Sequence, residues 1–232
     1  MKSSTAILIF SRTAKAEARH KIFAGKASEN IAAHAYLLNK TIATARETGV
    51  PYFHFTEKEQ YGETFEERLL NSFNHIFHEG YENIICIGSD CPQLTSTYLK
   101  ESKTTVERGV TTFGADENGG VYLIAISKAH FETGILENIS WNTHRVFAQC
   151  KYNAVKYGFE FSVLSVCKDI NNNEGLRNYL RSAEINSTIK WILLRLLGLI
   201  KQFELLSLLK KQNTALQSVT ILRGPPACLA FC

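Results

Sequence analysis

The segment Asn83-Ile84-Ile85-Cys86-Ile87-Gly88-Ser89-Asp90-Cys91-Pro92 indicates the fold class more strongly than any other part of the sequence. Four consecutive apolar residues, Ile84 to Ile87, predict a strand that is buried on both faces, as strands are inside parallel sheets. Pro92 cannot donate to a sheet ladder, so the strand has to end before it. We therefore expect Asp90 at the carboxyl end of a central strand, where open α/β sheets bind their ligands.

Two interpretations of Asp90 are open at this point. A carboxylate that is removed from water is costly unless it meets a partner, and the usual partner is a metal ion or a substrate. The alternative is a turn aspartate that accepts backbone hydrogen bonds after the strand.

Composition is typical of a soluble globular protein. The chain has 232 residues, of which 45% are hydrophobic and 21% charged, and this is enough for one large domain with an appendage. The net charge of +4 is mild, and no run of like charge is long enough for a nucleic-acid arm, so no nucleic-acid partner is expected. The six cysteines show neither a CxxC pair nor zinc spacing. We expect reduced thiols and a cytoplasmic location.

Strand and helix patterns alternate through residues 1–185 and predict an α/β fold with three layers and a mostly parallel sheet. We expect strands over residues 5–10, 52–55, 84–87, 110–115, 121–127 and 161–166. Ser28 and Thr143 are expected to be the N-caps of two of the intervening helices.

The character of the sequence changes after residue 185. Residues 186–232 are expected to form an amphipathic helix, around residues 191–209, followed by a loose C-terminal tail. The charges of Lys190, Arg195 and Lys201 argue against a transmembrane helix. Three uses of the apolar face stay open: packing on the domain, self-association with a partner subunit, and peripheral contact with a membrane surface.

A basic loop follows the first strand. Cationic side chains at that place in an α/β sheet suit phosphate recognition, although a solvated loop would have the same composition. Neither GxxxxGK[ST] nor GxGxxG occurs, so a P-loop or a Rossmann site has no support. The basic residues are Arg12, Lys15, Arg19, His20, Lys21 and Lys26.

Three further features could belong to the same ligand site. Gly119 and Gly120 permit close backbone approach to a ligand, or form a plain hairpin turn. Asp169 follows the last strand and is either a second metal ligand or the cap of the next helix. Trp141 could stack on a ring of a ligand or belong to the core.

Taken together, these loops resemble one known family. The segment Gly88-Ser89-Asp90-Cys91-Pro92-Gln93-Leu94-Thr95 is similar to the GSDCPxLT signature of the DUF2064 family. Three further segments match that family in the same order, its QxG…ERL segment, its DGGYYLxG strand and its IxWST turn. These are residues 60–69, Gly119-Gly120-Val121-Tyr122-Leu123-Ile124 and Ile139-Ser140-Trp141-Asn142-Thr143. The resemblance covers residues 5–183.

The chain departs from the family pattern in three places. The family's VKTRL appears here as Ala18-Arg19-His20-Lys21-Ile22. The acid that precedes Gly-Gly is replaced by Asn118, and the second acid of the closing DxDTPEDL is replaced by Asn171. An asparagine carbonyl can still coordinate Mg²⁺ or Mn²⁺, but it brings no negative charge.

The resemblance implies a GT-A-like, nucleotide-diphospho-sugar transferase fold. It also implies a glycosyltransferase that takes a nucleotide-diphospho-sugar donor and a small-molecule acceptor and depends on Mg²⁺ or Mn²⁺. Asp90, Asp169 and Asn171 would then hold the metal. Arg19 and Lys21 would contact phosphates, and Asn118, Gly119, Gly120 and Trp141 would face the sugar or the acceptor. Two alternatives stay open: a nucleotidyltransferase on the same fold, and a non-catalytic nucleotide-binding protein.

Overall fold

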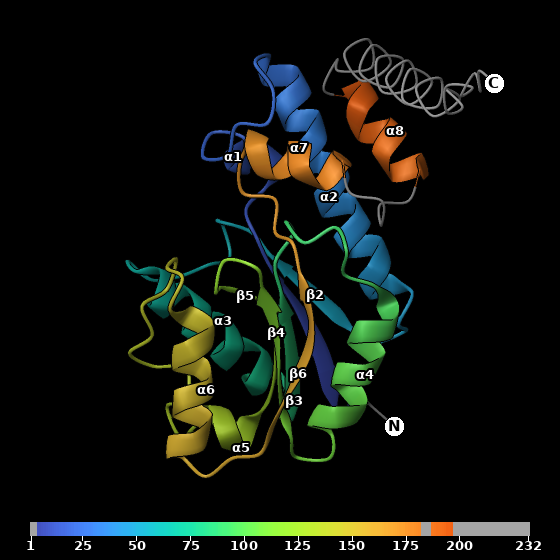
Figure 1. Ribbon diagram of the computed structural model, residues 1–232. Helices are drawn as coiled ribbons and strands as arrows, with labels where there is room; N and C mark the ends of the chain where they lie inside the picture. The colour runs from blue at the N-terminus through green and yellow to red at the C-terminus, as the bar shows by residue number, and fades with distance from the viewer. Residues whose placement is uncertain (1–3, 182–186, 197–232) are drawn as a thin grey trace, which may run out of the picture. The chain divides into compact units, whose positions relative to one another are not determined.

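The structure is a computed structural model that describes residues 4–181 and 187–196 (Figure 1). The chain divides into two compact units, residues 1–185 and residues 186–232. In the second unit, α8 spans Ser187–Leu196, so the later part of the helix expected over residues 191–209 lies outside the described residues. None of the helices that the structure describes is long and apolar enough to span a membrane.

A six-stranded sheet organises the first unit, with the strand order β2-β1-β3-β5-β4-β6. Its strands are β1 (Thr5–Phe10), β2 (Tyr52–Phe55), β3 (Asn83–Ile87), β4 (Thr111–Asp116), β5 (Val121–Ser127) and β6 (Phe161–Cys167). Only β5 runs antiparallel to its two neighbours, while β1 pairs in parallel with β2 and β3, and β4 with β6. The expected α/β fold is therefore confirmed, with a mixed sheet in which five strands share one direction.

Helices cover both faces of this sheet (Figure 1). On one face lie α2 (Ala27–Arg46) and α4 (Ser96–Val106), and on the other α3 (Phe65–His78), α5 (Lys128–Phe131) and α6 (Val146–Lys156). The short α1 (Ala14–Glu17) follows β1, and α7 (Asn173–Arg181) follows β6.

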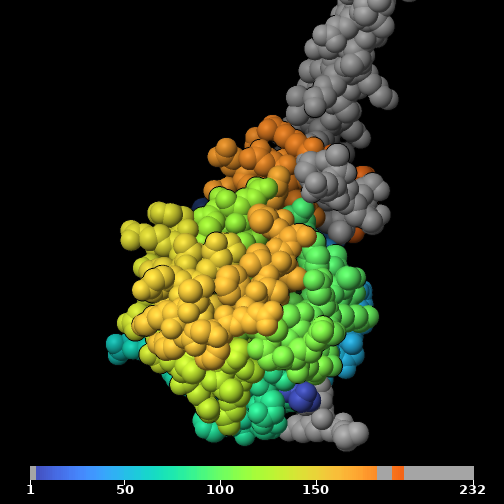
Figure 2. Space-filling view, turned by 60° about the horizontal axis from the view of Figure 1, so that its bottom comes forward, coloured from blue at the N-terminus to red at the C-terminus, as the bar shows by residue number. Residues whose placement is uncertain are grey.

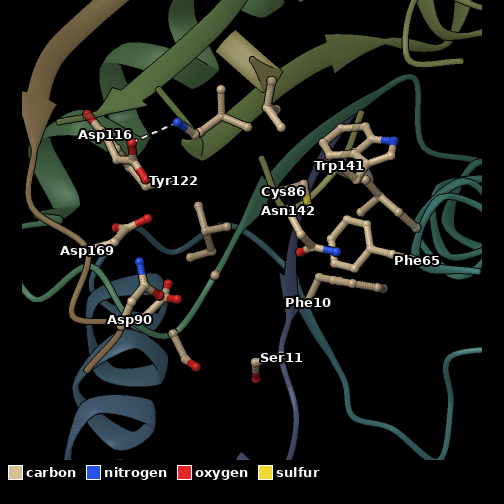
Figure 3. Close-up of a pocket in the computed structure, with 18 of the residues that line it drawn as sticks. Phe10, Ser11, Phe65, Cys86, Asp90, Asp116, Tyr122, Trp141, Asn142 and Asp169 are labelled. Atoms are coloured by element: carbon tan, nitrogen blue, oxygen red, sulfur yellow. Dashed lines mark hydrogen bonds between the residues drawn. The ribbon is translucent and has the colours of Figure 1, made fainter. Parts of the chain in front are cut away.

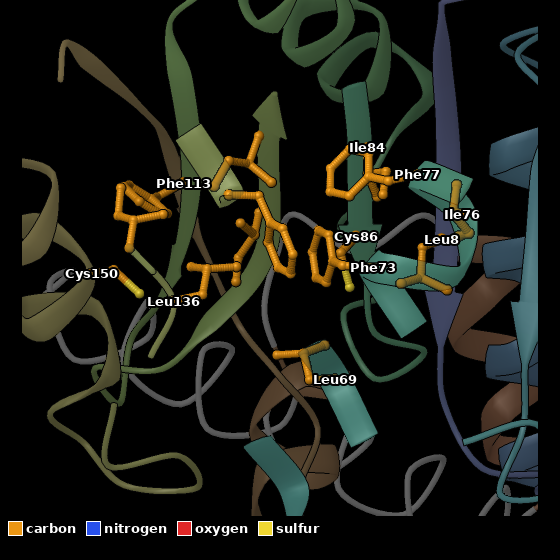
Figure 4. Packing of buried hydrophobic residues seen from close by; sticks show 14 of the residues in the cluster. Leu8, Leu69, Phe73, Ile76, Phe77, Ile84, Cys86, Phe113, Leu136 and Cys150 are labelled. Carbon is orange, nitrogen blue, oxygen red and sulfur yellow. The ribbon is translucent and has the colours of Figure 1, made fainter. Parts of the chain in front are cut away.

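The buried side chains of β3 explain why this strand lies inside the sheet. All five of its residues are buried. Ile84 and Cys86 join the core cluster under α3 and α6 (Figure 4), while Ile85 and Ile87 join the cluster under α2 and α4. Apolar residues at every position are what a strand covered on both faces requires.

The strand β6, by contrast, lies at the edge of the sheet. In Figure 2 it runs over the surface between α6 and α4. Val163 and Val166 are exposed, whereas Leu164 and Cys167 point into the core. Asp169 is therefore delivered to the ligand edge from an outer strand and not from the centre of the sheet.

Two expected helix caps are wrong. Helix α2 begins at Ala27, and Ser28 lies inside its first turn, where Glu29 is favoured by the helix dipole. Helix α6 begins only at Val146. Thr143 instead closes the preceding turn, because its hydroxyl donates to the Ser140 carbonyl at 2.6 Å and accepts from the Arg145 N–H at 3.2 Å.

The cysteines of the core give a first testable prediction. Cys86 and Cys150 are buried and free, and burial raises the pKa of both thiols, to about 12 for Cys150. Since the thiolate is the reactive form, we expect both to be labelled by a thiol reagent only as fast as the protein unfolds. Mass spectrometry of the native protein after a short pulse of iodoacetamide measures this, and rapid labelling of Cys86 would contradict its place in β3. The tail cysteines Cys228 and Cys232, which we expect to react readily, lie outside the described residues.

Candidate functional site

A cavity of about 720 Å³ lies at the carboxyl edge of the parallel strands (Figure 3). Its walls come from the loops after β1, β2, β3 and β6, from the start of α3, from the β4–β5 hairpin and β5, and from the loop before α6. Of the site residues expected from the sequence, seven line this cavity: Lys21, Asp90, Asn118, Gly120, Trp141, Asp169 and Asn171. Arg19 is exposed and, like Gly119, is not part of the lining.

Hydrogen bonds between two loops bring Asp90 and Asp169 together across the sheet edge. The strands β3 and β6 are not neighbours, because β5 and β4 lie between them. The Ile170 N–H nevertheless donates to the Asp90 carbonyl at 2.9 Å, and the Lys168 N–H donates to Oε1 of Gln93 at 2.7 Å. These two bonds fix the loops against each other.

A third carboxylate, Asp116, completes the acidic side of the cavity. Figure 3 shows Asp90, Asp116 and Asp169 on the same side. Asp116 is the last residue of β4 and lines the cavity. Asp116 is not among the site residues predicted from the sequence, although an acid at the end of a strand is a pattern that could have identified it.

Asp169 is the most perturbed carboxyl group of the site. Its Oδ1 atom is buried and has no hydrogen-bond partner in the described part of the chain. Burial, followed by the negative charges of Asp90 and Asp116, raises the pKa of Asp169 to about 9. The metal-free protein therefore holds a proton on Asp169 at neutral pH, because its burial and the neighbouring negative charges disfavour the ionised form.

Lys21 partly neutralises this acidic corner. Its Nζ atom donates to Oδ2 of Asp90 at 2.6 Å and lies 3.3 Å from Oε1 of Glu17. Burial opposes the charge of the ammonium group, but the two carboxylates outweigh it and raise the pKa of Lys21. Lys21 is thus a permanent cation at the position where a polyanionic ligand would meet the carboxylates. Arg12 and His20 line the cavity as well.

The buried side chain of Asn30 in α2 holds the loop that carries Lys21. Its Oδ1 accepts from the Phe23 N–H at 2.7 Å, and its Nδ2 donates to the carbonyls of Ala18 and Lys21 at 2.8 and 3.0 Å. The Lys21 carbonyl also lies 2.9 Å from Nε2 of His34, but the Phe23 N–H and the Ala18 carbonyl rely on Asn30, so its loss leaves polar groups unsatisfied.

We expect Asn30→Ala to destabilise the protein by about 1–3 kcal/mol, the usual cost of such unsatisfied groups. Urea denaturation monitored by circular dichroism measures the change. The matched control is Asn39→Ala, since Asn39 lies on the same helix but is exposed, and it is expected to change the unfolding free energy by less than about 0.5 kcal/mol. Equal effects of the two substitutions would contradict the anchoring role.

The glycine pair forms a hairpin turn, which is the plainer of the two alternatives. Asp116 accepts the N–H groups of Asn118 and Gly120 on Oδ1, both at 2.7 Å. Gly119 has a φ of +84°, and a Cβ atom there would collide with the His144 carbonyl. The close approach is thus to the protein's own loop before α6, and Gly120 alone of the pair lines the cavity.

The helix-cap alternative for Asp169 is wrong. The cap of α7 is Asn172, whose Oδ1 accepts the Gly175 N–H at 2.7 Å. Asp169 is therefore free of a capping role, and its carboxyl group lies at the cavity. Asn171 is exposed and lies on the cavity lining next to it.

The acidic corner fits a divalent cation that is shared with a ligand. Hard cations prefer oxygen ligands, and the partnerless Oδ1 of Asp169 is such a ligand. Among the described residues, however, no group of three Asp, Glu, His or Cys side chains is close enough to hold a metal ion alone. Mg²⁺ is commonly held by one or two carboxylates together with substrate phosphates, and this arrangement suits Asp90 and Asp169.

Comparison with known proteins finds one family and several related structures. The family model described as "Uncharacterized protein conserved in bacteria (DUF2064)" matches residues 21–143. The chain matches none of the curated proteins with which it was compared.

Among solved structures, a candidate nucleotide-diphospho-sugar transferase from Desulfovibrio desulfuricans G20 has a TM-score of 0.71 and 18% identity, over 87% of this chain and 98% of that chain. The chain therefore has the same fold as the Desulfovibrio desulfuricans protein. Rv0371c from Mycobacterium tuberculosis H37Rv, solved in complex with manganese, has a TM-score of 0.46 and 12% identity, over 78% of this chain and 100% of that chain.

Proposed function

Since this chain belongs to the DUF2064 family, and the matched residues 21–143 include Lys21, Asp90 and Asp116, we propose that it is a metal-dependent transferase that uses a nucleotide-diphospho-sugar donor. More specifically, we propose that it is a glycosyltransferase, which transfers the sugar of this donor to an acceptor. The observation that carries it is the meeting of Asp90 with the partnerless carboxyl oxygen of Asp169 beside Lys21 at the ligand edge of the sheet. A nucleoside diphosphate with a bound cation supplies the charges that such a corner lacks.

The roles of the residues follow from their charges. Asp90 and Asp169 would hold Mg²⁺ or Mn²⁺ together with the diphosphate, and the exposed Asn171 carbonyl could add a neutral ligand. The family has an acid where this chain has Asn118, and Asp116 would supply the carboxylate that is missing at that position. Lys21, which already has a carboxylate partner, would exchange part of that contact for a phosphate oxygen when the donor binds.

The proposed reaction exchanges one bond to the sugar for another. The bond between the anomeric carbon and the diphosphate oxygen breaks, and its electron pair leaves with the nucleoside diphosphate. An acceptor hydroxyl oxygen forms the new bond and releases its proton to a solvent base. A bound cation supplies charge neutralisation on the leaving diphosphate, and Lys21 and Arg12 add fixed positive charge to the same region.

A titration of nucleotides tests the proposal directly. Wild-type protein is titrated calorimetrically with UDP and GDP, with UDP-glucose and GDP-mannose, and with UTP and GTP, in the presence of Mn²⁺ and then with a chelator. We expect at least one of these nucleotides to bind, with an affinity that falls when the metal is chelated. A nucleotidyltransferase would bind the nucleoside triphosphates more tightly than the diphosphates and the nucleotide sugars, and a non-catalytic protein would bind with no dependence on Mn²⁺. Either result would overturn the glycosyltransferase proposal.

A further inference from the structure

The cavity has an apolar end that the donor chemistry does not explain. Figure 3 shows Phe10, Phe65 and Trp141 on the side of the cavity opposite Asp90, Asp116 and Asp169. Phe10 and Phe65 meet edge to face with their centroids 5.6 Å apart, and Phe65 and Trp141 have the same separation. These rings form an aromatic wall. Leu69, Ile124 and Val146 also line the cavity and are buried.

Hydrogen bonds hold Trp141 in place, and the charged side chain that lines this end of the cavity, Arg68, is itself bonded to the protein backbone. The indole N–H donates to Oε2 of Glu66 at 3.2 Å, and Oε1 of the same carboxylate accepts the Asn138 N–H. The guanidinium of Arg68, which also lines the cavity, donates to the Glu63 carbonyl at 2.9 Å. The polar ends of these side chains are thus turned toward the protein's own groups.

Asn142 gives this apolar end one adaptable polar group. It lies beside Phe65 in Figure 3, lines the cavity and has a φ of +62°. Asparagine tolerates this left-handed conformation better than most residues, but the conformation still has a cost, and such strained positions cluster at functional sites. Its amide can donate to or accept from a ligand hydroxyl.

A diphosphate is better matched to the acidic corner, where Lys21 pairs with both Asp90 and Glu17 and Arg12 pairs with the same Glu17, than to the apolar end, whose lining cation is Arg68. We propose that the aromatic wall binds the acceptor, and that this acceptor is a neutral, hydroxyl-bearing compound with a flat apolar body, of the aryl alcohol or aryl glycoside class. The assignment of this ligand as acceptor rests on the proposed glycosyltransferase function. The flat body packs against Trp141 and Phe65, and a hydroxyl meets Asn142.

The two tryptophans of the chain provide a direct probe. In a Trp191→Phe background, all tryptophan emission comes from Trp141. We expect phenyl β-D-glucoside to change this emission in a saturable way, with methyl β-D-glucoside and the anionic phenyl β-D-glucuronide at least about tenfold weaker. Glucuronide binding as tight as that of the neutral glucoside would overturn the neutral class, and equal binding of the methyl glucoside would overturn the aromatic contact. Absence of phenyl glucoside binding up to millimolar concentration would overturn the assignment altogether.

Variants of the wall distinguish this site from a nucleotide-base site. We expect Trp141→Ala to weaken calorimetric binding of phenyl β-D-glucoside about tenfold, and Trp141→Phe to retain most of it. Phe65→Leu is the second variant, in case Trp141→Ala does not fold. UDP and GDP affinities with Mn²⁺ should stay within about threefold of wild type in all three variants. A loss of nucleotide affinity that equals the loss of glucoside affinity would place the base at the wall and overturn the proposal.

The same titrations distinguish a failure of the proposed donor function from a failure of the proposed acceptor site. Nucleotide binding without phenyl glucoside binding overturns only the acceptor site. Phenyl glucoside binding without any nucleotide binding overturns the donor function, and the acceptor role fails with it. Asp90→Asn should weaken only the nucleotide, because Asp90 lies on the far side of the cavity from the aromatic wall.

Discussion

Asp90→Asn is expected to weaken Mn²⁺-dependent nucleotide binding by about 100-fold, within the range for removing one partner of a desolvated charge pair. The carboxylate of Asp90 faces the cavity at the end of the central strand β3, and its loop is fixed by the Ile170 N–H. An asparagine keeps the shape of this side chain and the backbone contacts of the loop. What it removes is one of the negative charges that a shared cation requires.

The fold should tolerate this substitution. Lys21 loses its bond to Asp90 but keeps Glu17, whose Oε1 lies 3.3 Å from Nζ. Loss of the Asp90 charge also relieves the repulsion that raises the pKa of Asp169. We therefore expect a melting temperature within about 3 °C of wild type, a shift that corresponds to less than about 1 kcal/mol.

The matched control is Glu117→Gln. Glu117 is an exposed carboxylate next to the site in sequence, on the β4–β5 hairpin, and its Oε1 pairs with Lys168 at 3.3 Å. It does not line the cavity, so its substitution removes the same charge without touching the proposed site. Calorimetric titrations of wild type and both variants, with Mn²⁺ and with chelator, measure the effect. Equal affinities for wild type and Asp90→Asn under both conditions would remove Asp90 from the site.

The sheet could be predicted from the sequence because each strand carried its own local signal. Apolar runs such as Ile84 to Ile87 are too hydrophobic for any other place in a small α/β protein, and Gly80 and Gly88 mark where this strand starts and stops. Helix starts were less well predicted. Ser28 and Thr143 have the right side chains for an N-cap, but the loops before α2 and α6 decide where each helix begins.

The acidic corner was only partly predictable, because it depends on contacts between distant loops. Asp90 and Asp169 each follow a strand and could be identified singly. The family pattern has its acid directly before the glycine pair, where this chain has Asn118, and it does not predict a carboxylate at Asp116, two residues earlier at the end of β4. That Lys21 pairs with Asp90, 69 residues away, follows from the packing of the loop on Asn30, and no local pattern encodes it.

Asp169→Asn is expected to stabilise the metal-free protein at neutral pH, and the gain should grow as the pH rises. In an unfolded chain the Asp169 carboxyl group titrates near its ordinary pKa of 3.8, whereas the folded protein raises this pKa to about 9. Between these values the unfolded state binds fewer protons than the folded state, so each rise in pH destabilises the fold through this residue. The penalty is absent below about pH 4 and complete above about pH 9.

An asparagine at this position does not titrate, and its amide can donate to the neighbouring carboxylates of Asp90 and Asp116. The difference in unfolding free energy between variant and wild type reports the titration of Asp169 and its coupling to Asp90 and Asp116, because the more distant titrating groups contribute equally to both proteins. We expect this difference to be near zero at pH 4 and to increase toward pH 8, with a slope of at most about 1.4 kcal/mol per pH unit.

Urea denaturation of both proteins in a chelating buffer at several pH values measures this slope. The single variant Asp90→Asn, which keeps Asp169, provides a second check. Without the Asp90 charge the pKa of Asp169 should fall, so the loss of stability with rising pH should level off at a lower pH. The same Asp169→Asn protein should lose Mn²⁺-dependent nucleotide binding, so that a gain in stability accompanies a loss of function. A difference in stability that does not change with pH would mean that Asp169 is ionised in the folded protein, and that its partnerless oxygen is reached by water. If Asp169→Asn is more stable and still binds nucleotide as wild type does, the buried carboxyl group is not a ligand of the proposed cation.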